Sequence, residues 1–186
     1  MRRGSLKLVD VPKYRELLEA VRRAYRDVAA GRYKIRDLAL VAVLTFTGCR
    51  IGEVLQLTRE DLDPRERVVR IRQLKKRGET FRLVPVPSEL FWDIMESYMW
   101  RVESKLFSIT KRQARNIVYK FSRRYLGKRV RPHAIRHSFA LAVLELTKNV
   151  EVVRRLLGHA SYDTLKSYLD YTQRDLEEEL SKLFTF

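Results

Sequence analysis

Apolar residues in the first part of the chain recur at helical spacing. One stripe is formed by Tyr14, Leu17, Leu18 and Val21. These positions follow the i, i+3, i+4, i+7 pattern of an amphipathic helix, and Gly31 can end it. Residues 38–46 are apolar on nearly all sides, which predicts a second helix at the centre of the core, with Asp37 as its N-cap. A third, short helix is expected over residues 50–57.

The pattern changes after the turn at Asp63-Pro64. Residues 68–71 and 81–87 contain the residue types that favour strands, and they predict the two arms of an antiparallel hairpin. Residues 75–79, between them, are polar and include a glycine. We therefore expect a hairpin loop that is longer than the common short form.

Helical periodicity returns after Pro87 and continues to the end of the chain. Thr110 and Gln113 have the spacing of a capping box, and a buried stripe is expected over residues 114–125. Further helices are expected over residues 135–146, 150–157 and 161–171, with a last one after residue 172. Together the patterns predict a mostly helical α+β fold with a small antiparallel sheet. We expect one domain over residues 1–186, with a core over 11–171 and a C-terminal helix over 172–186.

The charge balance narrows the class of partner. The 186 residues include 39 Lys and Arg against 23 Asp and Glu, which gives a formal charge of +16 and makes nucleic acid the expected partner. Cys49 is the only cysteine, which excludes an intramolecular disulfide and suits a reducing compartment such as the cytoplasm. Neither a signal peptide nor a membrane span is expected, because the longest apolar run is far shorter than the ~20 residues that a bilayer helix needs.

Positive charge is concentrated in residues 111–131, which contain nine Lys or Arg and no acid. A solvated helix usually mixes the two signs, so we expect this run to meet phosphates. The basic residues predicted to bind DNA, including two in the hairpin loop, are Lys76, Arg77, Lys111, Arg112, Arg115, Lys120, Arg123 and Arg124.

Two arginines stand apart from this surface charge. Arg50 directly follows the most apolar helix, so we expect its backbone to be anchored against the core. Arg136 lies three residues after His133, on a helix that Pro132 is expected to begin, and the two side chains share a face. The planar fork of arginine binds two phosphate oxygens at once, which lysine cannot copy.

These arginines belong to an ordered set of motifs by which the sequence resembles the tyrosine recombinases, the integrases of phages and archaeal viruses and their chromosome-dimer-resolving relatives. In that family a Thr-Gly-x-Arg-x-x-Glu segment, a hairpin lysine, a His-x-x-Arg segment, a Leu-Gly-His segment and a later tyrosine follow one another. Here they fall on Arg50 with Glu53, the Lys75-Lys76 loop, His133 with Arg136, Leu157-Gly158-His159, and Tyr168. The resemblance covers most of the chain and implies the fold of a tyrosine recombinase catalytic domain.

The resemblance implies how this set would act on DNA. Arg50 and Arg136 would clamp the scissile phosphate, and His159 would add a third hydrogen-bond donor. Tyr168 would attack the phosphorus and form a 3′-phosphotyrosyl bond. A 5′ hydroxyl from another strand would later reverse that bond, which gives site-specific recombination or integration.

Two proton transfers accompany the attack. The unperturbed phenol has a pKa near 10, so it needs a proton acceptor, and His133 is the candidate base. The leaving 5′ oxygen needs a proton, which the hairpin can deliver through Lys75, with Lys76 as the alternative. No cofactor and no metal are implied.

The resemblance also implies how the protein assembles. The partner would be double-stranded DNA, with a homotetramer on DNA and a monomer when free, acting in the cytoplasm. Most relatives have an N-terminal helical domain that closes around DNA, and we expect that domain to be absent here.

The same residues allow other interpretations. His133 and His137 are four residues apart and could form half of a zinc site with His159, but the spacing matches no closed zinc motif, and His137 is expected to be structural. Tyr162 and Tyr171 are rival nucleophiles. Glu53 is expected to orient Arg50 or a helix. At the level of function, the alternatives are a type IB topoisomerase and a non-catalytic basic DNA-binding module.

Overall fold

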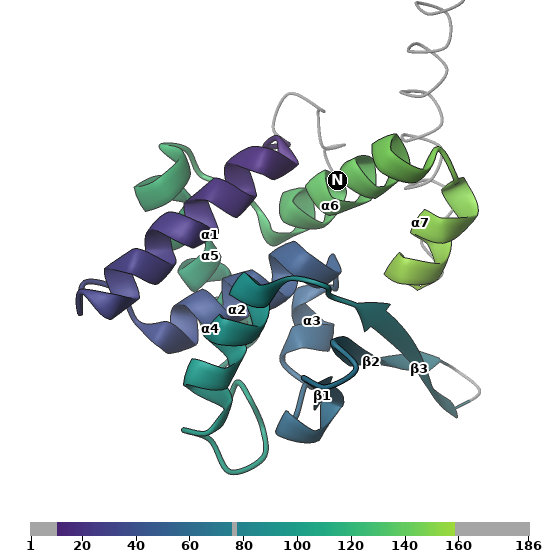
Figure 1. Cartoon of the computed structure of the whole chain (residues 1–186), viewed down its shortest axis with the longest axis horizontal. Helices are drawn as coiled ribbons and strands as arrows, with labels where there is room; N and C mark the ends of the chain where they lie inside the picture. The colour runs from purple at the N-terminus through teal and green to yellow at the C-terminus, as the bar shows by residue number, and fades with distance from the viewer. Residues whose placement is uncertain (1–10, 76–77, 159–186) are drawn as a thin grey trace, which may run out of the picture.

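The computed structural model describes residues 11–75 and 78–158. In these residues the helices pack together and a small sheet lies beside them (Figure 1). The helices are α1 (Tyr14–Ala29), α2 (Ile35–Thr47), α3 (Ile51–Val54), the 3-10 turn η2 (Arg59–Asp61), α4 (Glu89–Met99), α5 (Lys111–Leu126), α6 (Pro132–Thr147) and α7 (Val150–Leu157). The strands are β1 (Leu62–Asp63), β2 (Val68–Lys75) and β3 (Gly78–Pro85). This confirms the mostly helical α+β fold with a small antiparallel sheet.

Helix α2 is the central element, as its sequence predicts. It contacts α1, α4, α5 and α6, and all of residues 38–45 are buried. The predicted cap was wrong, because α2 begins at Ile35 and Lys34 is its N-cap. Asp37 instead lies in the first turn, where a carboxylate favours the positive end of the helix dipole. Within the described ranges, no helix is long and apolar enough to cross a membrane.

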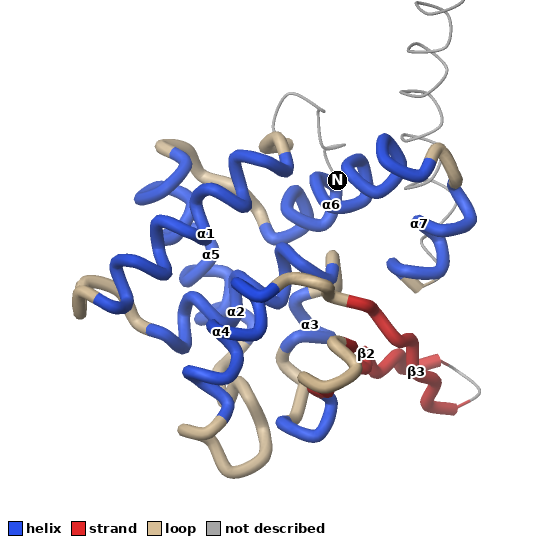
Figure 2. The backbone as a smooth tube through the Cα atoms, viewed as in Figure 1, coloured by secondary structure: helices blue, strands red, loops and turns tan. Residues whose placement is uncertain are grey.

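The three strands form an antiparallel sheet in the order β1-β2-β3, at one side of the helices (Figure 2). The pairing of β2 with β3 runs from Val68 opposite Pro85 to Lys75 opposite Gly78. Only residues 76 and 77 therefore lie between the strands, and the prediction of a long loop was wrong. The hydrogen bonds between the strands join backbone groups, so the polar residues that the sequence assigned to a loop can pair as well as apolar ones.

Two other boundaries also differ from the prediction. The short helix expected over residues 50–57 covers only Ile51–Val54. The chain after Pro87 is not continuously helical, because residues 100–110 between α4 and α5 form turns and an isolated bridge from Lys105 to Thr58. The predicted capping box is confirmed: the Thr110 N–H donates to Gln113 Oε1 at 2.8 Å, and the Gln113 N–H donates to Thr110 Oγ1 at 3.2 Å.

Contacts between distant parts of the sequence close the helical layer. Asp27 on α1 accepts hydrogen bonds from Tyr125 at 2.8 Å and Arg124 at 2.9 Å, which fastens α5 to α1. Ser138 on α6 donates to the carbonyl of Pro12 at 2.7 Å, just before α1 begins. The second contact holds the start of α1 against the first half of α6.

Candidate active site

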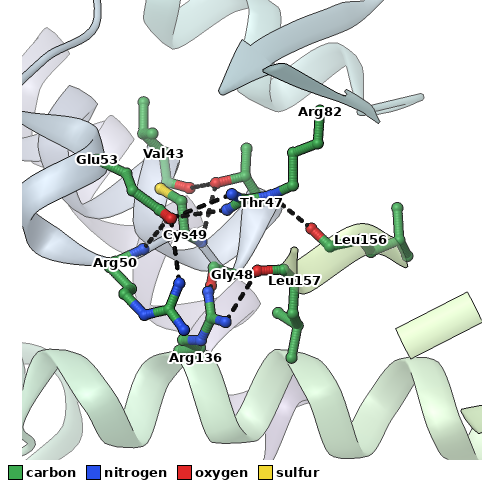
Figure 3. A network of polar contacts seen from close by, with 10 residues as sticks. All are labelled: Val43, Thr47, Gly48, Cys49, Arg50, Glu53, Arg82, Arg136, Leu156 and Leu157. Carbon is green, nitrogen blue, oxygen red and sulfur yellow. Dashed lines mark hydrogen bonds and ion pairs between the residues drawn. The ribbon is translucent and has the colours of Figure 1, made fainter. Parts of the chain in front are cut away.

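Arg136 is a buried cation at the centre of the site. It points from α6 between two turns of chain, and only 2% of the residue is exposed. Its Nη1 donates to the carbonyl of Gly48 at 2.8 Å, and its Nη2 donates to the carbonyl of Leu157 at 3.0 Å (Figure 3). Burial, and then the charge of Arg50, lower the pKa of Arg136 to about 10, so it remains a cation at neutral pH. One side chain thus joins the end of α2 to the end of α7.

Arg50 is the accessible member of the pair. It precedes α3, and its side chain is 47% exposed. Its backbone N–H donates to Glu53 Oε2 at 2.7 Å, and its Nη1 donates to Glu53 Oε1 at 3.2 Å. The preceding Cys49 is buried, which gives Arg50 the anchored backbone that the sequence predicts. Burial also raises the pKa of the Cys49 thiol to about 12, so this cysteine is not a nucleophile at neutral pH.

Glu53 has a second cationic partner that the sequence analysis missed. Arg82 on β3 binds the carboxylate with both ends of its fork, at 3.1 Å from Nη1 to Oε1 and 2.8 Å from Nη2 to Oε2. Burial alone would raise the pKa of Glu53, but the hydrogen bonds and charge of Arg82 outweigh it and lower that pKa. Glu53 is therefore an ionised link between two arginines, and its contact with Arg50 is that of an orienting residue.

The histidines of α6 lie beside these arginines. Partial burial, followed by the charges of Arg136 and Arg50, lowers the pKa of His133. His133 is therefore neutral at neutral pH and can accept a proton. The ring of His137 packs edge-on against that of His133, with 4.6 Å between the ring centroids, and burial lowers its pKa to about 4. In the part of the chain that the structure describes, no three His, Cys, Asp or Glu side chains are close enough together to hold a metal.

Several predicted site residues lie outside the described residues or at their edge. The backbone of Lys75 ends β2, while Lys76 and Arg77 fall in the gap that follows it. His159 and Tyr168, together with the rival tyrosines Tyr162 and Tyr171, also lie outside the described residues. The described chain ends at Gly158, directly after the Leu157 carbonyl that Arg136 binds.

The basic residues of α5 are all exposed, but they do not share one face. Lys111 and Lys120 are about two and a half turns apart and therefore point to opposite sides of the helix. Lys111 lies beside the active site, since its Cε is 3.5 Å from where a Cβ on Gly52 would stand. Arg124 differs from the others, because its Nη1 donates to the carbonyl of Arg32 at 3.1 Å while its Nη2 binds Asp27.

Comparison with known proteins shows what the chain as a whole is similar to. The sequence model of the phage integrase family matches residues 9–174. The tyrosine recombinase XerA of Pyrococcus furiosus is 30% identical over 159 residues, which cover 80% of this chain and 55% of that protein. A tyrosine recombinase of Pseudothermotoga lettingae is 31% identical over 157 residues, covering 80% of this chain and 54% of that protein. The chain thus spans about half the length of these relatives.

Two solved structures show that the fold is shared. The crystal structure of XerA recombinase matches with a TM-score of 0.74 and 23% identity, over 100% of this chain and 66% of that one. The structure of XerH recombinase bound to a palindromic difH substrate, after cleavage, also matches with a TM-score of 0.74, with 22% identity over 94% of this chain and 53% of that one.

Proposed function

The chain belongs to the phage integrase family, and we propose that it is a site-specific DNA recombinase that cleaves and rejoins strands through a 3′-phosphotyrosyl intermediate. The observation that carries the proposal is the pairing of Arg50 with Arg136. These residues are far apart in the sequence, yet Arg136 binds the carbonyl of Gly48, which lies two residues before Arg50. Both belong to a strongly basic chain. Such a pair suits the two non-bridging oxygens of a phosphodiester.

In the proposed reaction, the arginines hold the phosphate and neutralise the charge that builds up during attack. A guanidinium has five N–H groups, and the two carbonyl bonds of Arg136 use two of them, which leaves three for the phosphate. Arg50 adds an exposed guanidinium, and His159 would add a further donor. The oxygen of Tyr168 attacks the phosphorus, and the bond from phosphorus to the 5′ oxygen breaks.

Protons balance the two steps. His133 takes the proton of the Tyr168 hydroxyl, for which its neutral ring is suited. Lys75, with Lys76 as the alternative, gives a proton to the leaving 5′ oxygen. When a 5′ hydroxyl attacks the phosphotyrosyl bond, the same groups work in reverse. The phosphotyrosyl bond conserves the energy of the phosphodiester, so the proposed reaction needs no energy-rich cofactor. The two arginines and His159 would supply the charge neutralisation for which other phosphoryl-transfer sites use a metal.

The test of this proposal is a covalent adduct. The chain is incubated with a pool of nicked suicide duplexes of randomised sequence, because sequence preference resides in base contacts that no motif encodes. After denaturation, a protein band with added DNA mass is expected. Tyr168→Phe removes one oxygen and should abolish this band, whereas the matched control Tyr171→Phe should retain it. Mass spectrometry of the nuclease-trimmed adduct then identifies the modified tyrosine.

Other outcomes separate the alternative functions. DNA binding without any adduct would indicate a non-catalytic binding module. If the chain forms the adduct and relaxes supercoiled DNA but never joins two different duplexes, it would be a type IB topoisomerase. If mass spectrometry finds the nucleotide on Tyr162 or Tyr171, that tyrosine is the nucleophile, and the class of reaction stays the same.

The two lysines can be distinguished by changing the leaving group. A substrate with sulfur at the 5′ bridging position releases a thiolate, whose conjugate acid has a pKa near 8.5, so this departure needs no proton donor. If Lys75 is the acid, Lys75→Ala should cleave normal DNA slowly and the sulfur substrate at nearly the normal rate. Lys76→Ala should cleave both substrates as wild type does, and the reverse pattern would assign the role to Lys76.

We also propose the assembly in which this reaction takes place. Residues 1–186 would form one catalytic domain with a core over 11–171 and a C-terminal helix over 172–186, acting on double-stranded DNA in the cytoplasm. Recombination joins two duplexes at four cleavage sites, so the active form would be a homotetramer on DNA and a monomer when free. Sedimentation with and without a duplex that carries a target site measures both states.

A further inference from the structure

Arg82 joins three segments that are distant in the sequence. Its side chain is 7% exposed, and its Nη1 and Nη2 both bind Glu53 from β3. Its Nε donates to the carbonyl of Leu156, in the last turn of α7, at 2.9 Å (Figure 3). The second strand of the hairpin, β3, is therefore tied both to α3, whose N-cap is Arg50, and to α7.

Two buried arginines together bind the end of α7. The last carbonyls of a helix lack partners within it and carry the negative end of its dipole. Here Arg82 binds the carbonyl of Leu156, and Arg136 binds the carbonyl of Leu157. The next residue, Gly158, packs so closely on the hairpin that a Cβ there would lie 1.5 Å from Gln73 Nε2 and 3.0 Å from Arg82 Nη1.

We propose that Arg82 is a positioning residue for the strand-transfer reaction, an inference that rests on the proposed function. Through Glu53 it fixes the guanidinium of Arg50. Through the Leu156 carbonyl it fixes the end of α7, from which the chain continues to His159. The two phosphate-binding segments and the hairpin are thereby held in one relative arrangement.

The chemistry of the contact explains why arginine is required. A lysine has one nitrogen, which cannot reach both carboxylate oxygens and a separate carbonyl in the fixed geometry of the guanidinium fork. Each of the three guanidinium nitrogens of Arg82 already donates to Glu53 or to the Leu156 carbonyl, so we do not expect Arg82 to contact DNA. A buried ion pair is also weak evidence for stability, since the desolvation of both charges offsets much of their attraction.

The test separates the rate of cleavage from the affinity for DNA. Arg82→Gln and Arg82→Lys are compared with wild type in single-turnover adduct formation at saturating duplex, and the dissociation constant is measured separately. We expect Arg82→Gln to slow cleavage about 100-fold, as misplacement by about 1 Å can do, while the dissociation constant changes less than about threefold. Arg82→Lys should lie between Arg82→Gln and wild type, because it keeps the charge and only some of the bonds.

A neighbouring arginine supplies the matched control. Arg70 on β2 of the same sheet binds Asp61, a carboxylate whose side chain is 1% exposed, with 3.1 Å from Nε to Oδ1. Arg70→Gln thus also breaks an ion pair with a buried acid, but on a residue that is not linked to Arg50. The Arg70 side chain is 46% exposed, so Arg70→Gln should lower the midpoint of unfolding less than Arg82→Gln does, and it should leave the cleavage rate unchanged.

Coupling to Glu53 provides a further readout. If Arg82 acts through Glu53, the loss of rate in the double variant Arg82→Gln, Glu53→Gln should be smaller than the product of the two single losses. Wild-type rates in folded Arg82→Gln or Arg82→Lys would overturn the assignment. Loss of affinity equal to the loss of rate would also overturn it, because Arg82 would then be a phosphate contact.

Folding defects and failure of the proposed function give different results. If Arg82→Gln does not fold, the cleavage rates of Arg82→Lys and Glu53→Gln test the proposal instead. Wild-type cleavage rates in both variants would overturn it. If the wild-type chain forms no adduct with the randomised pool, the proposed function itself fails and this role fails with it.

Discussion

Arg136 has a structural role and a proposed catalytic role. Its carbonyl contacts fix the ends of α2 and α7, while its remaining N–H groups are suited to a phosphate. Arg50, by contrast, is half exposed and relies on Glu53 for its orientation. The site thus pairs a rigid cation with an accessible one, which suits a ligand that must enter and leave.

Replacing Arg136 with lysine should affect both tasks. An ammonium cannot hold two phosphate oxygens, so cleavage should fall about 100- to 1000-fold, while DNA affinity falls less. One of the two buried carbonyls also loses its donor, which should lower the free energy of unfolding by about 1 to 3 kcal/mol. Suicide-duplex cleavage and urea denaturation measure the two effects. A folded variant that cleaves within a few-fold of wild type would show that Arg136 does not clamp the phosphate.

His137 should make the stability of the protein depend on pH. Its pKa is about 4 in the folded chain and near 6.5 when unfolded, so the unfolded chain binds more protons between these values. The contribution of His137 to the free energy of unfolding is therefore fully present above pH 6.5. It should fall as the pH falls towards 4, by up to about 1.4 kcal/mol per pH unit. Urea denaturation at successive pH values should show a smaller slope for His137→Asn. An unchanged slope would indicate that His137 is not neutral when folded.

The turn between α2 and α3 depends on one glycine. Gly48 has φ +60°, and a Cβ there would lie 2.4 Å from the ring of Phe139. Its carbonyl is also an anchor of Arg136. The backbone of this turn therefore approaches α6 more closely than any side chain would permit.

Two alanine substitutions test this close approach. Gly127, at the end of α5, has φ +69° and nothing within 4 Å of where a Cβ would stand, so Gly127→Ala should cost only the strain of the left-handed backbone, about 1 to 2 kcal/mol. Gly48→Ala adds an overlap with Phe139 and should cost about 1 to 3 kcal/mol more. Urea denaturation of both variants gives the difference. Equal losses would mean that α6 moves away freely.

Long helices could be predicted from the sequence, but the limits of the short elements could not. The apolar run of α2 and the capping box of α5 depend on local patterns, and both were predicted correctly apart from the N-cap of α2. The hairpin was misjudged because its paired tip is polar. Strand pairing depends on the partner strand, which no local pattern reports.

The candidate site was predictable only in part for a similar reason. The family motifs identified Arg50 and Arg136, whose carbonyl and carboxylate partners the structure then supplied. Arg82 was missed because both faces of β3 carry apolar residues, so alternation does not show which face is buried. The sequence did contain one indication. Arg82 is an even number of positions from Val84 and Val86 and so lies on the same face of the strand, and both valines are buried.

The whole molecule carries far more positive than negative charge, and that excess should dominate its binding to DNA. Counterion release gives a slope of about −0.9 in log affinity against log salt for each phosphate neutralised. A domain that contacts about six phosphates should then bind about 1000-fold more weakly at 200 mM than at 50 mM salt. Fluorescence anisotropy over this range measures the slope, and a flat titration would contradict the prediction.

Single substitutions show which basic residues contribute to the salt dependence of DNA binding. Arg115 is exposed on α5, and Arg115→Gln should reduce the slope by about one phosphate contact. Arg124 is engaged by Asp27, so Arg124→Gln should change the slope less and lower the stability instead. Equal changes in the two slopes would mean that Arg124 leaves Asp27 when DNA binds.

The contact between the start of α1 and α6 has a consequence for how the protein is made. Ser138 and Pro12 are 126 residues apart, and ribosomes add about 5 to 20 residues per second, so α1 waits about 6 to 25 s for this partner. Its contact with α2 can form early, but those with α5 and α6 cannot. We therefore expect proteolysis of nascent chains, stalled at successive lengths, to show full protection of α1 only once α6 has left the ribosome.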